Sequence, residues 1–226
     1  MTCIDFHAHI LPRADHGSDS TITSLGQLEQ AEKTGVEIVV ATPHFYPGRH
    51  QIQSFIHRRE AALNTITAAY RGSIRIIPAA EVLLCEGLQN LHELPELCVR
   101  GTKTLMLEMS APPWSARQVD TLDAVREAGY QIVLVHPDRF PYKQVEKLFA
   151  LGFRGQLNAE GLCRLSSRRR ALRWVDQGYI LALGSDVHGL GVHYRQYAHA
   201  LKLLGPRQIS LMETARALLD KTGTNL

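Results

Sequence analysis

The sequence has few cysteines, and they are not arranged to bind a structural metal or to form a disulfide framework. Cys3, Cys85, Cys98 and Cys163 include no CxxC pair and have no regular spacing. A chain of 226 residues buries roughly 70% or more of the surface that its unfolded form exposes, so a hydrophobic core alone can hold it together. We therefore interpret the cysteines mostly as small core residues and expect any bound metal to serve chemistry.

Long apolar runs and a strong charge of one sign are also missing. No run of about 18 apolar residues occurs, and no basic segment followed by a long apolar one opens the sequence. We therefore expect no stable membrane insertion and a cytoplasmic location. The 25 Lys and Arg residues against 22 Asp and Glu give a net charge of +3. Dedicated nucleic-acid binders are far more basic, so we expect no nucleic-acid partner, whereas an anionic substrate is compatible.

Short β-rich apolar runs alternate with helical patterns along the whole chain, which predicts parallel strands joined by crossover helices. The predicted strands are 2–6, 37–42, 75–80, 104–109, 131–135, 155–158 and 179–184. The predicted helices run from caps at 18–20 to about 33, then 52–70, 116–128, 144–150, 167–177, 194–204 and 207–219. No repeat or composition shift divides the chain, so we predict an α/β fold, a distorted (β/α)7 TIM-like barrel forming a single domain over residues 1–226. Pro78 removes a ladder donor, so its strand is expected to be irregular.

Histidines and acidic residues stand where the predicted strands end. His7 and His9 follow the first strand two residues apart, so their side chains can point to the same side and bind one cation. The later strand ends carry His44, Glu81, Glu108, His136, Asp186 and His188. In a parallel barrel these ends converge on one face, where buried carboxylates would repel one another unless cations lay between them. Imidazole and carboxylate ligands without thiolate favour two or three ions of manganese, iron or zinc.

Taken together, these motifs resemble the PHP (polymerase and histidinol phosphatase) superfamily. The resemblance rests on His7-x-His9, Thr42-Pro-His44, Glu81, Glu108-Met-Ser, His136-Pro-Asp-Arg139 and Ser185-Asp-Val-His188. Within the superfamily, the sequence most resembles the bacterial manganese-dependent protein-tyrosine phosphatases of capsule and exopolysaccharide loci. The resemblance extends from Ile4 to the last helices and implies a seven-stranded barrel with a three-metal site that hydrolyses phosphotyrosine.

The resemblance also implies roles for individual residues. The metal ligands carried over by motif are His7, His9, His44, Glu81, Glu108, His136, Asp186 and His188. Arg139 would hold the substrate phosphate, a hydroxide bridging two metals would attack phosphorus, and Asp138 or a nearby histidine would protonate the leaving phenol. The implied partner is a phosphotyrosyl protein, namely an autophosphorylated bacterial tyrosine kinase of polysaccharide biosynthesis.

The chain departs from the family pattern at two places. Asp15-His16-Gly17 stands where the family usually reads Asp-Asp-Gly, so His16 becomes a candidate metal ligand in place of a carboxylate. After the final Asp-x-His motif the family tends to place an arginine within five residues. Here His193 and Arg195 are the candidates for contacting phosphate, and the ability of a guanidinium to fork onto two phosphate oxygens favours Arg195.

A cysteine mechanism competes with this interpretation, because Cys163 and Arg169 fit the C-x5-R signature of cysteine-dependent tyrosine phosphatases. The residues between them lack the glycines that let backbone N–H groups cradle a phosphate, and the neighbouring arginines fit a solvated helix face better.

Two other functions fit the same strand-end residues. One is a histidinol-phosphate or other small-phosphoester hydrolase, and the other is a non-catalytic phosphopeptide-binding module whose metal site has decayed at His16. Phe45, Tyr46 and Trp114 follow strand ends and are candidates for an apolar wall against a phosphotyrosine ring.

Overall fold

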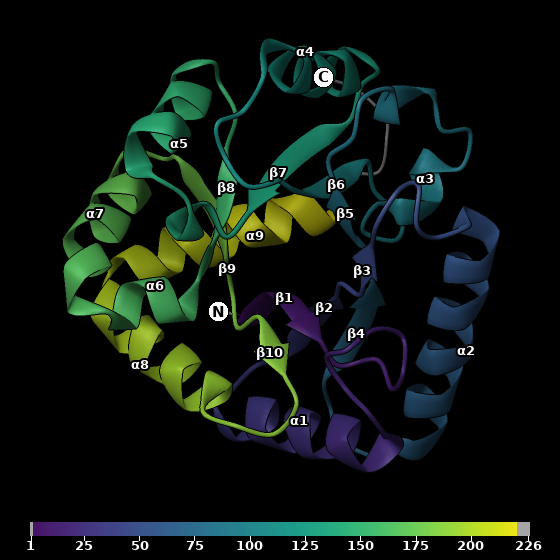
Figure 1. The fold of residues 1–226 in the computed structure, drawn as a ribbon. Helices are drawn as coiled ribbons and strands as arrows, with labels where there is room; N and C mark the ends of the chain where they lie inside the picture. Colours follow the sequence, from purple (N-terminus) through teal and green to yellow (C-terminus); the bar gives the residue numbers. More distant parts are fainter. Residues whose placement is uncertain (1, 221–226) are drawn as a thin grey trace.

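Parallel strands lie at the centre of the molecule and helices surround them (Figure 1). The computed structural model describes residues 2–220. The strands are β1 (Ile4–His9), β2 (Ile38–Ala41), β3 (His44–Phe45), β4 (Arg75–Pro78), β5 (Glu81–Leu83), β6 (Thr104–Glu108), β7 (Gln131–Val135), β8 (Gly155–Asn158), β9 (Ile180–Gly184) and β10 (Val187–His188). They form two parallel sheets, ordered β10-β1-β2-β4 and β3-β5-β6-β7-β8-β9.

Three of the predicted strands are each followed, after a break of two residues, by a short further strand that was not predicted, and each break passes the chain from one sheet to the other. β2 and β4 in the first sheet lead into β3 and β5 in the second, and β9 in the second leads into β10 in the first. Within residues 2–220 no ladder joins β1 directly to β9. Instead, the backbone N–H of Asp186 donates to the carbonyl of His7 at 2.8 Å and links β1 to the segment between β9 and β10. The predicted distorted α/β barrel is confirmed.

The break between β4 and β5 follows from Pro78, which has no N–H to continue a ladder. Pro78 ends β4, and β5 begins only at Glu81. The expected irregularity of this strand is therefore confirmed.

The predicted end of the first strand was wrong, because β1 continues to His9 with all six residues buried. Polar and apolar side chains alternate to its end, so the two histidines extend the strand instead of ending it.

The helices are α1 (Thr21–Lys33), α2 (Ile52–Ala69), α3 (Leu94–Leu97), α4 (Ala116–Glu127), α5 (Tyr142–Ala150), α6 (Ala159–Cys163), α7 (Leu165–Asp176), α8 (His193–Leu204) and α9 (Arg207–Asp220). The seven predicted helices match to within a few residues, and the side chain of Ser20 caps α1 by accepting from the N–H of Thr23. Four short elements were not predicted, because they are too short to show a helical period: α3, α6 and the 3-10 turns η1 (Leu88–Asn90) and η2 (Pro137–Arg139).

Among residues 2–220, no helix is both long and apolar enough to cross a membrane. The cytoplasmic location stays a prediction.

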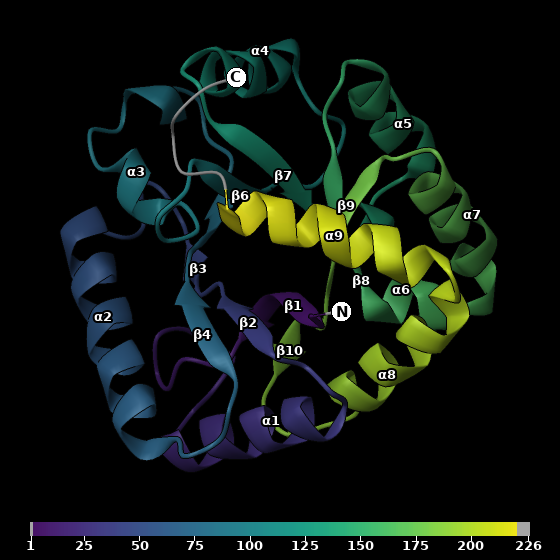
Figure 2. The same ribbon diagram turned by 180° about the vertical axis from the view of Figure 1, so that it is seen from behind.

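Helix α9 covers one end of the barrel, as Figure 2 shows. Met212 of α9 places its sulfur 3.4 Å from the N–H of Ile4, and the hydroxyl of Thr104 donates to the carbonyl of Leu218 at 3.0 Å. Ile4 and Thr104 begin β1 and β6, so α9 covers the amino-terminal ends of the strands. The carboxyl ends, with their polar side chains, therefore lie at the opposite end of the barrel.

The position of α9 predicts a variant that weakens the fold without touching the polar end. Met212 is 1% exposed, so Met212→Ala should lower the free energy of unfolding by about 2–5 kcal/mol through lost contacts and a cavity. Glu213→Ala, on the exposed side of the same helix, should change it by less than about 0.5 kcal/mol. Chemical denaturation measures both. Equal effects of the two substitutions would show that α9 does not pack on the barrel in this way.

Candidate metal centre

The carboxylate of Glu81 lies at the centre of a cluster of histidines and is fully buried. Its Oε2 is 3.1 Å from His7 Nε2, 3.2 Å from His9 Nε2 and 3.1 Å from His44 Nδ1. Its Oε1 is 2.8 Å from His136 Nε2. Four imidazoles, two from β1, one from β3 and one from the end of β7, therefore surround one carboxylate.

The strand register explains part of this convergence. His44 is the register partner of Glu81 between β3 and β5, and His9 is the partner of His188 between β1 and β10. Residues opposite each other in neighbouring strands lie about 5 Å apart and present their side chains to the same face. Each of the three strand breaks therefore brings a predicted ligand beside one from a neighbouring strand.

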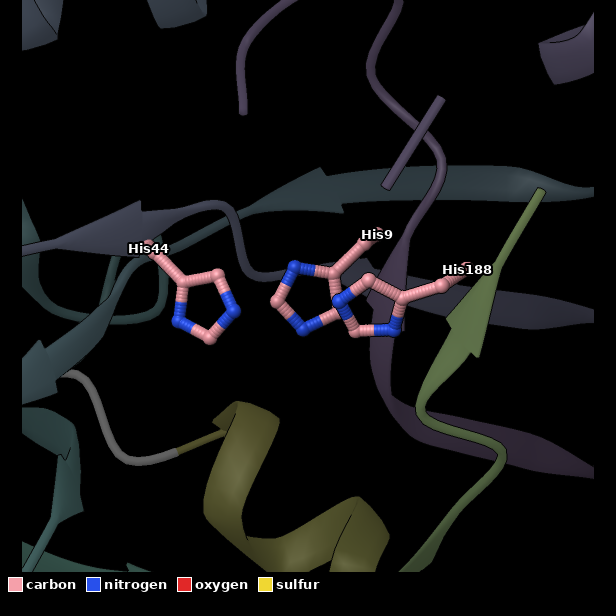
Figure 3. Close-up of side chains that lie close together, drawn as sticks. All are labelled: His9, His44 and His188. Atoms are coloured by element: carbon pink, nitrogen blue, oxygen red, sulfur yellow. The ribbon is translucent and has the colours of Figure 1, made fainter. Parts of the chain in front are cut away.

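Three overlapping groups of side chains are able to hold a cation. Within each group the ligand atoms lie within 4.8 Å of one another: His7 with His9 and Glu81, His44 with Glu81 and Glu108, and His9 with His44 and His188. Figure 3 shows the rings of the last group gathered together. The ring centroid of His9 is 4.1 Å from that of His188 and 4.5 Å from that of His44. Because the groups share members, ions bound in them would share ligands.

The remaining two predicted ligands lie beside these groups. Asp186 Oδ1 is 3.4 Å from His9 Nε2, 3.5 Å from His188 Nδ1 and 3.7 Å from His7 Nε2. His136 Nε2 is 3.9 Å from the nearer oxygen of Glu108. The structure thus brings all eight strand-end side chains together at the carboxyl end of the barrel.

Two of these residues have unusual backbone conformations. His136 has a φ of 34° and Asp186 a φ of 52°, a region that residues other than glycine enter at a cost of about 1–3 kcal/mol. Such strain is concentrated at functional sites, where it directs a side chain that a regular strand would point elsewhere. The close approach of β9 to His7 also requires a glycine at position 184, because a Cβ there would lie 2.5 Å from Cβ of His7.

Asp15 supports the cluster from the first loop, a role that the sequence analysis did not assign. Its Oδ2 is 2.6 Å from His9 Nδ1 and accepts the backbone N–H of His44 at 3.0 Å, while its Oδ1 accepts that of Gly17 at 2.9 Å. A carboxylate on the far nitrogen of a ligating imidazole fixes the orientation and tautomer of the ring. Gly17 permits this close approach, since a Cβ there would lie 2.1 Å from that of His9.

Two amides of β8 have a similar supporting role and were also missed. Gln156 Oε1 is 2.8 Å from His7 Nδ1, and the side-chain amide of Asn158 donates to Asp186 Oδ2 at 2.8 Å. The amides also join each other, because Gln156 Nε2 donates to Asn158 Oδ1 at 3.0 Å. Both are buried polar residues two apart in a strand, the same signal that singled out His7 and His9.

His16 lies at the rim of the cluster and is exposed. Its ring centroid is 4.8 Å from that of His44 and 4.9 Å from that of His188, but it belongs to none of the three groups found among residues 2–220. In this loop, the carboxylate that contacts the cluster is that of Asp15. The ligand role of His16 stays a prediction.

The protonation states of Glu81, His44 and His188 suit a bound cation. Burial lowers the pKa of His7 and His9, but the neighbouring carboxylates outweigh it and raise both pKa values, so a cation would displace protons from these two rings. Burial disfavours an ionised Glu81, but the charge of His7 and hydrogen bonds from His136 and His7 hold the pKa of its carboxyl well below the usual range. Burial lowers the pKa of His44 and of His188 to about 4, so both rings are neutral at pH 7 with a lone pair free for a metal. His44 Nδ1 is buried and makes no hydrogen bond, although Glu81 Oε2 lies 3.1 Å away. These side chains therefore fit divalent ions.

Arg139 and Asp138 occupy very different surroundings within η2. The guanidinium of Arg139 donates to Asp186 Oδ2 and its side chain is 46% exposed, which places it at the edge of the cluster. The carboxyl of Asp138 is turned toward the start of α6, where it accepts the N–H of Asn158 at 3.3 Å. Burial raises the pKa of Asp138.

The other two candidates for phosphate contact lie in the first turn of α8. His193 is half-buried, its Nδ1 has no hydrogen-bond partner, and burial lowers its pKa. Arg195 is exposed.

A cavity of about 520 Å³ opens beside the cluster. Its lining consists of Tyr46, Pro47, Arg49, Leu83, Glu108, Met109, Ser110, Ala111, His136, Arg139 and Phe140. Tyr46 is part of the wall, as expected. Phe45 is not, because it is buried and packs on Phe55 with ring centroids 5.1 Å apart. Trp114 packs edge-on against Phe140 at 5.4 Å and so supports the wall from behind.

The surroundings of Cys163 do not favour a nucleophilic thiol. Its Sγ donates to the carbonyl of Gln196 at 3.4 Å, and burial raises its pKa. Arg168 donates to the carbonyls of Leu162 and Cys163 at 2.9 Å. Carbonyl oxygens therefore occupy the place where a phosphate cradle would need N–H groups.

Two relatives share most of their length with this chain. The tyrosine-protein phosphatase YwqE of Bacillus subtilis is 25% identical over 215 residues, which cover 89% of this chain and 83% of the relative. The tyrosine-protein phosphatase CpsB of Streptococcus agalactiae serotype V is 24% identical over 224 residues, which cover 89% of each.

Solved structures share the fold. A crystal structure from the study of YwqE from Bacillus subtilis and CpsB from Streptococcus pneumoniae, described there as metal-dependent tyrosine phosphatases, superimposes with a TM-score of 0.80 at 20% identity, covering 98% of this chain and 96% of the other. A probable 2-pyrone-4,6-dicarboxylic acid hydrolase of Acinetobacter baumannii superimposes with a TM-score of 0.54 at 14% identity, covering 97% and 99%.

The family of capsular polysaccharide synthesis proteins CpsB/CapC matches residues 3–205. This match includes every strand and all eight strand-end residues of the cluster. The resemblance that the motifs indicated is thereby confirmed, and the chain belongs to the CpsB/CapC family.

Proposed function

We propose that this chain is a metal-dependent protein-tyrosine phosphatase and that residues 1–226 form one metallophosphatase domain. The observation that carries the proposal is the cluster of five histidines and three acidic side chains around Glu81, which opens onto a cavity with an arginine at its edge. The tyrosine-protein phosphatase names of the relatives support the same activity.

The centre would hold two or three divalent ions, with manganese as the first choice and iron or zinc as alternatives. When bound, such ions supply Lewis acidity toward a phosphoryl group and lower the pKa of water. The ligands would be His7, His9, His44, Glu81, Glu108, His136, Asp186 and His188, with His16 as a candidate at the rim. Asp15, Gln156 and Asn158 hold three of these side chains in place through the hydrogen bonds described above.

Arg139 would bind the substrate phosphate. Its guanidinium lies between the ligand Asp186 and the cavity, so a phosphate beside the centre could accept charge-assisted hydrogen bonds from it. The unpartnered Nδ1 of His193 makes that side chain a second candidate for phosphate contact or for proton donation, together with the exposed Arg195. Asp138 keeps its candidate role as proton donor, although its carboxyl bonds to Asn158.

The cavity has the chemistry of a phosphophenyl site. Tyr46, Leu83, Met109 and Phe140 provide apolar surface, while Arg139 is the cation nearest the cluster. A mostly apolar pocket with a few placed polar groups is the usual form of a small-ligand site. The substrate would be a phosphotyrosyl protein, and the family's connection with capsular polysaccharide synthesis supports a bacterial tyrosine kinase of that process.

Turnover of two substrates tests the proposed activity directly. After loading with manganese, kcat/KM should be higher for a phosphotyrosyl peptide than for histidinol phosphate, because the cavity offers apolar surface to a phenyl ring. The reverse order would indicate a small-phosphoester hydrolase. Peptide binding without turnover of either substrate would indicate a phosphopeptide-binding module.

A second prediction separates the metal centre from the cysteine. Removal of metal by a chelator should abolish activity and manganese should restore it, because the proposed chemistry needs cations and no thiol. Glu108→Ala should lower kcat by several orders of magnitude, whereas Cys163→Ser should keep nearly full turnover. Metal content is measured alongside by elemental analysis. An inactive Cys163→Ser enzyme that works in excess chelator would contradict the metal assignment.

The proposed role of Arg139 gives a third prediction. Arg139→Ala should lower kcat about 10²-fold or more while the metal content stays unchanged, since the side chain stabilises developing phosphate charge. Arg117→Ala is a matched control, because Arg117 is 79% exposed and pairs only loosely with Glu86 at 3.7 Å. Loss of metal from Arg139→Ala would mean that the arginine serves mainly to hold Asp186.

A further inference from the structure

A second cavity, of about 380 Å³, lies on the other side of Tyr46 from the proposed phosphophenyl site. Its lining consists of Arg13, Ala14, Asp15, His16, His44, Tyr46, His50 and Arg58. Tyr46 belongs to both cavities, and its ring stacks on that of His44 with centroids 5.3 Å apart. The second cavity therefore meets the metal centre at His44 and meets the first cavity at Tyr46.

The second cavity carries two positive charges without matching negative ones. Arg13 Nε donates to the carbonyl of Asp19 at 3.0 Å and Arg58 Nε to that of Ala14 at 2.8 Å. These bonds hold the side chains, and within residues 2–220 neither guanidinium lies within 4.0 Å of a carboxylate. The charge of Arg13 acts on the exposed Asp19 from farther away and is the smallest of the contributions to the lowered pKa of that carboxyl. The remaining donors of both fork-shaped groups are free to bind an anion.

The one acid in this lining, Asp15, directs its carboxylate to the histidine cluster and makes no ion pair with Arg13 or Arg58 within residues 2–220. Both oxygens of Asp15 are engaged by His9, by the N–H of Gly17 and by the N–H of His44. A positive potential in the cavity agrees with the lowered pKa of His50, to which burial contributes most and the charge of Arg58 contributes next. The cavity is thus built for a negatively charged group.

The position of the cavity indicates which group this would be. A phosphotyrosine with its ring beside Phe140 and Tyr46 would hold its neighbours in the peptide at the mouth of the first cavity, because consecutive Cα atoms are only 3.8 Å apart, and the second cavity adjoins the first at Tyr46. Side chains on one side of the phosphotyrosine would then enter the second cavity. The two cavities differ in character, since the first has the apolar Leu83, Met109 and Phe140 and the second has none of these.

We propose that the cavity lined by Arg13, His50 and Arg58 is a specificity subsite for an anionic side chain, a carboxylate or a second phosphate, that flanks the phosphotyrosine of the substrate. The proposal rests on the proposed phosphatase function. It adds that the enzyme selects among phosphotyrosyl segments by the charge of their neighbours. Charge-assisted bonds at a partly buried site are worth enough for about a 10-fold selection.

The test compares peptides that differ only beside the phosphotyrosine. In the first series each peptide carries a single Glu, at one of the two positions before the phosphotyrosine or one of the two positions after it. A matched series carries Gln at the same positions, and a third series carries a second phosphotyrosine there. With the manganese-loaded enzyme, kcat/KM should be about 10-fold higher for Glu than for Gln on one side only, mostly through KM. The third series shows whether a phosphate replaces the carboxylate.

Substitutions then locate the effect. Arg13→Gln and Arg58→Gln should each reduce the preference for Glu about 3-fold or more, while kcat/KM on the Gln peptide and metal content stay unchanged. Arg117→Gln removes one surface charge outside both cavities and should leave the preference intact. Because Arg58 also holds the carbonyl of Ala14, Arg13→Gln keeps the test valid if Arg58→Gln folds poorly.

The outcomes separate this inference from the proposed function. Equal turnover of Glu and Gln peptides by the wild type, or a preference that survives both substitutions, would overturn the subsite while leaving the phosphatase activity standing. Absence of turnover on every peptide and on a small aryl phosphate would overturn the phosphatase function instead. In that case the dissociation constants of the same peptides decide the subsite, with a tighter Glu peptide as the supporting result.

Discussion

The burial of the Glu81 carboxylate is the constraint on which the rest of this site depends. An ionised carboxylate without contact to water is costly unless positive charge or hydrogen-bond donors surround it. Four imidazole nitrogens lie within 2.8–3.2 Å of its two oxygens, and they come from β1, β3 and the end of β7. The positions of β1, β3, β5 and the end of β7 are therefore tied together by one charge.

The broken strands explain how a barrel of short strands can bring so many candidate ligands to one point. A regular strand presents every second side chain to a face, and a residue near its end reaches the site only if the register allows. Breaks after β2, β4 and β9 restart the register at or beside His44, Glu81 and His188. Helix α9 packs across the amino-terminal end of the barrel, and the polar site lies at the carboxyl end. A substitution in the contact between α9 and the barrel therefore lies away from the side chains of the site.

Tyr46 divides the surface around the centre into two chemically different parts. On one side, apolar side chains together with Arg49 and Arg139 line the cavity proposed for a phosphophenyl group, and on the other side Arg13 and Arg58 line the cavity proposed for a second anion. A substrate that is a folded protein with a phosphorylated segment offers both kinds of group at once, whereas a small phosphoester fills only the first. The presence of both cavities therefore favours a protein substrate over a small metabolite.

Local patterns in the sequence determined the order of strands and helices and the eight residues at the strand ends, since alternation and helical period act over a few neighbouring positions. They also predicted that the strand containing Pro78 is irregular. Only the tertiary structure decided that His7 and His9 lie within β1, that Phe45 is buried, and that Asp15, Gln156 and Asn158 hold the cluster. The tertiary structure alone also decided that Arg139 pairs with Asp186 and that two cavities lie beside Tyr46. These features depend on which side chains meet across strands far apart in the chain, and that is set by sheet register and loop packing, which no local pattern encodes.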